Sequence, residues 1–227
     1  MTTLNMTTLD MTPLDMTSRL VEQAIARLCH DLSGLIGTVG NALDLLAEEV
    51  TGNEVLAFAD TASRVLTQRL RLMRTAWGPE IPAMTKTSFR VLIEEPLQSR
   101  RVTLDMTHLA DNRVFSPAAG RLQLNIILLA ADCMPRGGTI TLYGQPDGVL
   151  TGIESPPNMQ PAAWPTELSD CINDPSAVLA SLGSPRPVQL LLTVMLAASR
   201  NLPLSIVAIA QSGRPGLRWT QVDPDQP

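Results

Sequence analysis

The chain has 227 residues, with 17 Lys and Arg against 22 Asp and Glu, and a formal net charge of -5. This length accommodates one large domain or two modest ones, and an acidic balance without a long basic run argues against nucleic acid as a partner. Three widely spaced cysteines, two histidines and the lack of a C-x-x-C motif argue against a disulfide framework or a zinc site. This cysteine usage predicts a reduced, cytoplasmic protein. Because no uninterrupted apolar run reaches about 18 residues, we expect no membrane span.

Residues 1–16 form a five-residue near-repeat that starts at Met1, Met6, Met11 and Met16. The repeat has neither the basic start nor the apolar block of a signal peptide. Its low complexity predicts a mobile tail.

Two helices are predicted next, over about 18–50 and 54–77, with Ser18 as the first N-cap and a turn at 51–53. The apolar residues of the first helix recur at steps of three and four, which is the helix period. They are Ile25, Leu28, Leu32, Leu35, Ile36, Val39, Leu43 and Leu46. Residues 17–78 therefore predict an antiparallel helical hairpin.

His30 lies about 175° from the centre of this apolar stripe, so it faces water or a partner. Gly34, Gly37 and Asn41 continue the same outer strip. Two glycines inside a helix cost about 1 kcal/mol each relative to alanine. We therefore hypothesise that the strip is cleared so that another protein can bring a reacting group onto the imidazole. The alternative is an exposed histidine on a helix whose glycines ease packing against a neighbour.

Four polar neighbours of His30 are candidates for the same site. Asp31 can orient the ring by accepting a hydrogen bond from one nitrogen, which leaves the other nitrogen to attack. Arg27 can contact phosphate or a partner carboxylate, and Ser33 and Asn41 can contact a partner. The competing interpretation is that all four are ordinary surface residues of a helix.

A lone hairpin cannot cover both of its apolar stripes. The usual solution pairs two hairpins into a four-helix bundle, which predicts a homodimer. The alternative is a monomer in which the hairpin folds onto the second half of the same chain.

After a predicted linker over 78–87, the pattern changes character. Helices are predicted at 89–95, from the Ser116 cap to about 134, and at 187–200, with a further short helix after the proline-rich loop 156–165. Strands are predicted at 101–106, 139–143, 149–153, 204–210 and 217–222. This order indicates an α+β unit over 86–223, with helices on one face of a mixed sheet.

Two blocks of residues resemble the ChpT-like histidine phosphotransferases. The first is Ala26-Arg27-Leu28-Cys29-His30-Asp31-Leu32, followed by Gly37, Gly40-Asn41 and Leu43-Asp44-Leu45-Leu46. The second is Leu124-Asn125-Ile126-Ile127-Leu128-Leu129-Ala130-Ala131, followed by Met134-Pro135-Arg136-Gly137-Gly138-Thr139. The order of predicted elements also matches this family over nearly the whole chain after the tail.

The resemblance implies a hairpin domain that forms a dimeric four-helix bundle and carries the histidine, followed by an α/β sandwich similar to the ATPase domain of histidine kinases. It also implies that phosphate passes from the receiver aspartate of a hybrid histidine kinase to His30, and from there to response-regulator receiver domains. Magnesium is expected on the visiting receiver, beside whose acidic pocket the acyl phosphate forms.

The ATPase-like part departs from the kinase pattern. Asn125 is kept, but Leu129 stands where the kinase metal ligand would align. Glu154-Ser155-Pro156-Pro157-Asn158 stands where kinases carry Asp-x-Gly-x-Gly, and no G-x-G triplet occurs in the chain. Because proline removes the N–H donors of a phosphate cradle, we expect a degenerate ATPase fold that binds no ATP. An atypical ATP-dependent histidine kinase and a noncatalytic dimeric scaffold are the two alternatives.

Overall fold

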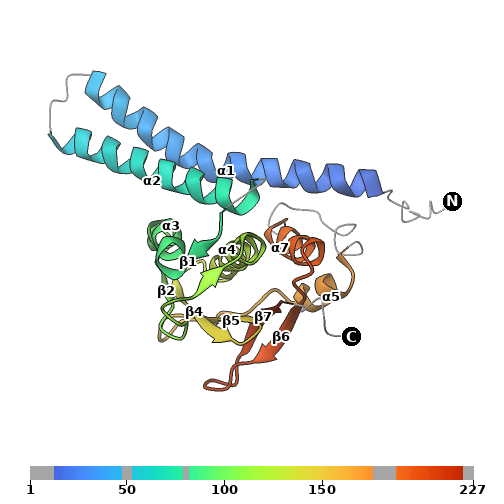
Figure 1. The fold of residues 1–227 in the computed structure, drawn as a ribbon. Helices are drawn as coiled ribbons and strands as arrows, with labels where there is room; N and C mark the ends of the chain where they lie inside the picture. Colours follow the sequence, from blue (N-terminus) through green and yellow to red (C-terminus); the bar gives the residue numbers. More distant parts are fainter. Residues whose placement is uncertain (1–12, 48–52, 79–81, 176–187, 222–227) are drawn as a thin grey trace, which may run out of the picture.

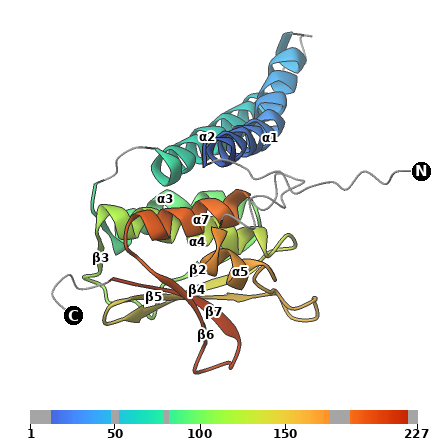
Figure 2. The same ribbon diagram turned by 90° about the vertical axis from the view of Figure 1, so that its right-hand side faces the viewer.

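The computed structural model describes residues 13–47, 53–78, 82–175 and 188–221. The hairpin of α1 (Pro13–Ala47) and α2 (Asn53–Trp77) lies over a layer of helices, and those helices cover one face of a sheet (Figures 1 and 2). The covering helices are α3 (Lys86–Gln98), α4 (Pro117–Asp132) and α7 (Val188–Ser199), with the short α5 (Leu168–Asn173) beside α7. No helix in these ranges is long and apolar enough to cross a membrane.

The predicted hairpin is confirmed, but the residue at which its first helix was predicted to start is wrong. Helix α1 begins at Pro13, so Ser18 lies inside it and does not cap it. Proline is favoured in the first turn of a helix because its fixed φ suits that turn and its missing N–H needs no partner there. The last residues of the predicted tail, 13–16, are therefore helical, and 1–12 lie outside the described residues.

The sheet is mixed, as predicted, with strand order β2-β4-β5-β7-β6. Strands β2 (Val102–Asp105) and β4 (Gly138–Gln145) pair in parallel, while β5 (Gly148–Glu154), β7 (Pro215–Thr220) and β6 (Leu204–Ala208) continue antiparallel. A second pairing was not predicted: β1 (Met84–Thr85) runs antiparallel to β3 (Val114–Phe115). Residues 84–87 of the predicted linker therefore belong to β1 and to the start of α3. The strand was missed because its two residues pair with a partner far along the chain.

Helix α4 lies at the centre of the fold, between the hairpin and the sheet (Figure 2). The Ser116 hydroxyl caps it by accepting from the N–H of Ala119, as the sequence predicts. From Ala119 to Ala131 its side chains are buried except at Leu128, which is typical of a helix covered on all sides. Gln123 in this buried stretch accepts from the Trp219 indole and donates to the Thr151 hydroxyl, which ties α4 to the sheet.

The apolar stripe of α1 is covered on one side only. Ala42 is fully buried, but Ile25, Ile36 and Leu43 are 55%, 56% and 57% exposed. On α2, Leu56 and Leu70 are also exposed. One end of the hairpin contacts α3, α4 and α7, and the remainder projects beyond the second unit (Figure 1). The chain by itself therefore leaves a strip of apolar surface on the hairpin without cover among the described residues.

Candidate functional site

The site lies on α1 at the level where the hairpin meets the second unit. His30 presents its imidazole to solvent, with 88% of the side chain exposed. This outward position follows from the helix period, and the sequence prediction of exposure is confirmed. The ring is therefore accessible to a group delivered by another protein.

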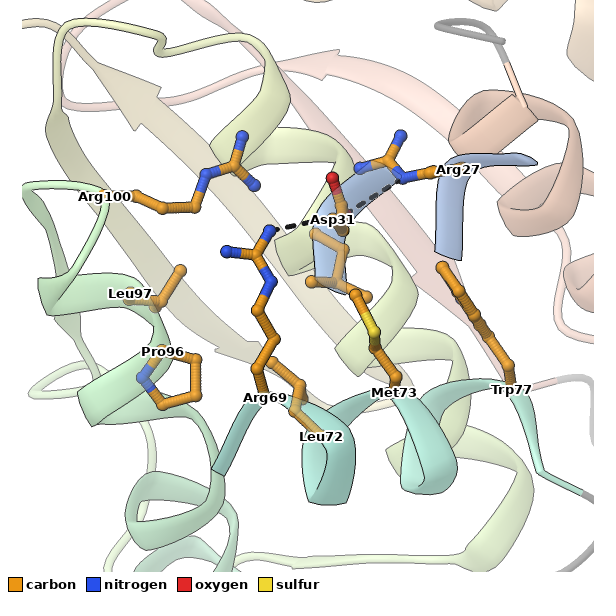
Figure 3. Close-up of a pocket in the computed structure, with 10 residues that line it drawn as sticks. Arg27, Asp31, Arg69, Leu72, Met73, Trp77, Pro96, Leu97 and Arg100 are labelled. Carbon is orange, nitrogen blue, oxygen red and sulfur yellow. Dashed lines mark ion pairs between the residues drawn. The ribbon is translucent and has the colours of Figure 1, made fainter. Parts of the chain in front are cut away.

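Asp31 is the immediate neighbour of the ring. Its Oδ1 lies 3.3 Å from His30 Nδ1, while Oδ2 faces Arg69 Nη2 of α2 at 3.3 Å and Arg27 Nε at 3.8 Å. Only 16% of the Asp31 side chain is exposed. Figure 3 shows the guanidinium groups of Arg69 and Arg27 pointing toward this carboxylate. The carboxylate is thus anchored on one oxygen and directed at the imidazole with the other.

Arg27 does not point to the face that carries His30. Its Nη2 lies 2.6 Å from Asp132 Oδ2 at the end of α4, and only 12% of the side chain is exposed. Arg100, in the turn after α3, binds the other oxygen of Asp132 at 2.8 Å. Contact of Arg27 with phosphate or a partner stays a prediction, and the geometry instead gives Arg27 a link between α1 and the second unit.

Arg27, Asp31, Arg69 and Arg100 border a small cavity at the hairpin junction (Figure 3). Its volume is about 20 Å³, which is room for about one water molecule. The remaining lining is largely apolar: Leu72, Met73, Trp77, Pro96, Leu97 and Leu128. Ion pairs in such surroundings are screened less by solvent than exposed pairs are.

The outer strip beyond the imidazole has the open surface that the sequence predicts. A Cβ placed on Gly34 or on Gly37 would meet no atom within 4 Å. Asn41 is exposed, and the Ser33 hydroxyl donates to the Cys29 carbonyl of its own helix at 2.6 Å. Roles for Ser33 and Asn41 in partner contact stay predictions.

Asn125, which the kinase pattern associates with metal binding, is 1% exposed and fully occupied. Its amide donates to the carbonyls of Ala76 and Arg121, and its oxygen accepts from the Trp77 indole at 3.2 Å and from Gln189 at 3.0 Å. The side chain therefore fastens the end of α2 to α4 and α7. None of these contacts leaves an oxygen directed at an open site.

The glycine turn of the second block has a backbone role. Gly137 has a φ of +90°, and a Cβ there would lie 2.4 Å from the Arg101 carbonyl oxygen. Any other residue would clash with this carbonyl in a left-handed conformation that L side chains rarely adopt. The turn lets β4 begin beside β2.

Three residues of the site were missed by the sequence reasoning: Arg69, Arg100 and Asp132. Arg69 is one of several arginines on α2, and Asp132 ends an apolar helix. Nothing local distinguishes them from solvated surface charges. Only the packing of α1 and α2 on the second unit brings them together.

Comparisons with known proteins agree with this architecture. The family model of the histidine phosphotransferase C-terminal domain matches residues 87–212. The protein phosphotransferase ChpT of Brucella abortus (strain 2308) is 25% identical over 121 residues, which are 52% of this chain and 56% of that protein. The matched part thus spans little more than half the length of this curated relative.

Among solved structures, a bacterial phosphotransferase superposes with a TM-score of 0.63 at 20% identity, over 93% of this chain and 97% of that one. This likeness shows a shared fold. The cytoplasmic segment of histidine kinase QseC gives a TM-score of 0.39 at 13% identity, over 72% of this chain and 94% of that one. A likeness this low carries no argument about function.

Proposed function

Because this chain belongs to the histidine phosphotransferase family, we propose that it carries phosphate on His30 between proteins of two-component signalling. In this proposal, the receiver aspartate of a hybrid histidine kinase supplies the phosphate and response-regulator receiver domains take it. The observation that carries the proposal is an imidazole that is 88% exposed, with its Nδ1 3.3 Å from an anchored carboxylate.

The geometry favours Nε2 as the attacking atom. With Nδ1 occupied by Asp31, the neutral ring holds its proton on Nδ1 and keeps the Nε2 lone pair free. A bond forms between Nε2 and phosphorus while the bond from phosphorus to the aspartyl oxygen of the receiver breaks. Asp31 then stabilises the positive charge that develops on the ring. Magnesium belongs to the receiver in this scheme.

We also propose that the chain works as a homodimer. The uncovered residues of the hairpin, Ile25, Ile36 and Leu43 of α1 with Leu56 and Leu70 of α2, supply an apolar surface of the kind that a second hairpin buries in a four-helix bundle. His30 lies on a different side of α1, about 120° or more away at the helix period, and stays accessible in such a bundle.

In this proposal the second unit is a docking and structural module without ATP chemistry. Support comes from Asn125, whose amide is used to fasten three helices together. Glu154, at the start of the segment where kinases are glycine-rich, pairs with Arg214 at 3.0 Å. Asn125 is thus engaged in contacts that hold the fold, and Glu154 in an exposed ion pair.

The test is incubation with a phosphorylated receiver domain in one arm and with Mg-ATP alone in the other, followed by mapping of the phosphorylated residue. We expect label on His30 in the receiver arm and none with ATP alone. His30→Ala abolishes the label without unfolding the protein, because the side chain lies outside the core. The matched control His108→Ala keeps it, since His108 stacks on Tyr143 in the second unit. Label in the His30→Ala variant would overturn the assignment, and label from ATP alone would favour a kinase.

A further inference from the structure

A chain of alternating charges connects His30 to the second unit. Asp31 contacts the imidazole and lies between Arg69 and Arg27, Arg27 reaches Asp132, and Asp132 is bound by Arg100. We infer that Asp132, acting through Arg27 and Asp31, is a positioning residue for the His30 imidazole. This inference rests on the proposed function of His30 and adds the end of α4 to its site.

The Asp31 carboxylate is restricted in its orientation. Its two oxygens serve different partners, Oδ2 for the arginines and Oδ1 for Nδ1 of the ring. With Arg69 held at 3.3 Å on Oδ2, rotation of the carboxylate would break a charge-assisted contact. The ring is therefore oriented by a group that is itself fixed from α2.

Arg27 is shared between two carboxylates, and Asp132 holds the stronger contact. The guanidinium lies 2.6 Å from Asp132 but 3.8 Å from Asp31, and its buried Nε has no hydrogen-bond acceptor within range among the described residues. Without the charge of Asp132, Asp31 is the carboxylate that still contacts Arg27 among the described residues. The guanidinium would then close on Asp31 and compete with the imidazole for its oxygens.

Asp132 stands where a helix by itself disfavours a carboxylate. It is the last residue of α4, at the negative end of the helix dipole, so its charge depends on outside cations. Arg27 and Arg100 supply them, from α1 and from the turn after α3. This arrangement makes the placement of α4 against the hairpin a determinant of how much of the Asp31 carboxylate is available to the ring.

The experiment compares Asp132→Asn with Asp147→Asn. Asp147 lies in the turn after β4, at the end of that strand far from α4, and both of its carboxylate oxygens accept from Nη2 of Arg218. It serves as the matched control. In Asp132→Asn we expect phosphate acceptance to slow about tenfold with the KM for the receiver unchanged, by analogy with metal-binding histidines, whose outer partners account for roughly 10- to 100-fold effects. Asp132→Glu restores most of the rate, and Asp147→Asn leaves it unchanged.

A spectroscopic readout separates positioning from a purely structural role. The chain has two histidines, so the ring ¹⁵N spectrum holds two pairs of signals, one from Nδ1 and one from Nε2 of each ring, with His108 as the internal reference. In alkaline solution we expect the wild-type His30 ring to carry its proton on Nδ1. In Asp132→Asn its signals move toward the other tautomer, while those of His108 stay in place.

The two proposals fail in different ways. If wild-type protein takes no phosphate from any receiver, the proposed function fails while the ¹⁵N spectra still decide the coupling of Asp132 to the ring. If phosphate transfers normally in Asp132→Asn and the His30 signals are unchanged, the positioning role is overturned and the proposed function stands. An equal loss in Asp147→Asn would also overturn it, because the effect would then belong to general stability.

Discussion

Asn125 offers the sharpest quantitative test of how this fold is held together. Asn125→Ala removes two donated and two accepted hydrogen bonds at a residue that is 1% exposed. These four hydrogen bonds contribute unequally to the free energy of unfolding. The Arg121 carbonyl keeps the regular helix bond of α4, and the Gln189 amide retains the Thr193 hydroxyl and the Asn125 carbonyl as acceptors. The groups that lose most are the Ala76 carbonyl and the Trp77 indole N–H.

The expected magnitude follows from these two groups. Ala76 lies in the last turn of α2, where carbonyls have no partner within the helix, so in the variant its oxygen is left buried without a partner among the residues that the structure describes. An orphaned buried polar group costs about 1–3 kcal/mol, and the half-buried Trp77 indole falls at the lower end because water can reach it. We expect the free energy of unfolding to fall by about 3 kcal/mol, which at this chain length lowers the Tm by roughly 6–12 °C.

The assay is urea unfolding followed by circular dichroism and tryptophan fluorescence, with Asn112→Ala in an exposed turn as the control. Asn125→Asp destabilises the protein at least as much as Asn125→Ala, because its carboxylate faces the Ala76 carbonyl. A loss below about 1 kcal/mol for Asn125→Ala, equal to the control, would refute the reasoning. Stabilisation of the wild type by Mg-ATP that disappears in Asn125→Ala would return the residue to a metal-binding role.

Three further outcomes are expected. Gly34→Leu lowers the rate of phosphate transfer at least tenfold while the helix gains nearly 1 kcal/mol, and Gly34→Ala keeps most of the rate; equal rates in all three proteins would contradict a cleared docking strip. Ile36→Glu raises the dissociation constant of the dimer about 100-fold or more, because it buries an unpaired charge in the interface. If analytical ultracentrifugation finds an unchanged dimer, this face is not the interface. Burial and the adjacent Asp132 raise the pKa of Cys133 to about 12, and burial raises the pKa of Cys171 to about 11. We therefore expect that neither thiol is alkylated at pH 8 until urea is added. Detection of either modified cysteine in the folded protein by mass spectrometry would contradict this.

Much of the secondary structure could be predicted because its signals are local. Ser116 followed by Pro117 marks the start of α4, and the alternation over 139–143 marks a strand that the sheet contains. The pair β1 and β3 could not be found this way, since each strand has two residues and becomes a strand only through its distant partner. The start of α1 at Pro13 was missed because the repeat of the first residues suggested a tail.

The features of the candidate site likewise separate into those that local sequence predicts and those that depend on tertiary packing. The exposure of His30 and the open surface at Gly34 and Gly37 follow from the phase of one helix, which advances by 100° per residue whatever the rest of the chain does. The position of Asp31 beside the ring was also expected. The anchoring of Asp31 by Arg69, and the engagement of Arg27 with Asp132, depend on two docked helices and were not.

The amino-acid order by itself therefore determined which side of α1 carries the histidine, which residues clear the space around it and which family pattern the chain follows. The tertiary structure decided that Arg27 faces inward to Asp132 and that the side chain of Asn125 holds the end of α2 to α4 and α7. The physical reason is range. Helix phase and capping arise from neighbours within one or two turns, whereas the partner of a buried charge or amide is chosen by how whole elements pack.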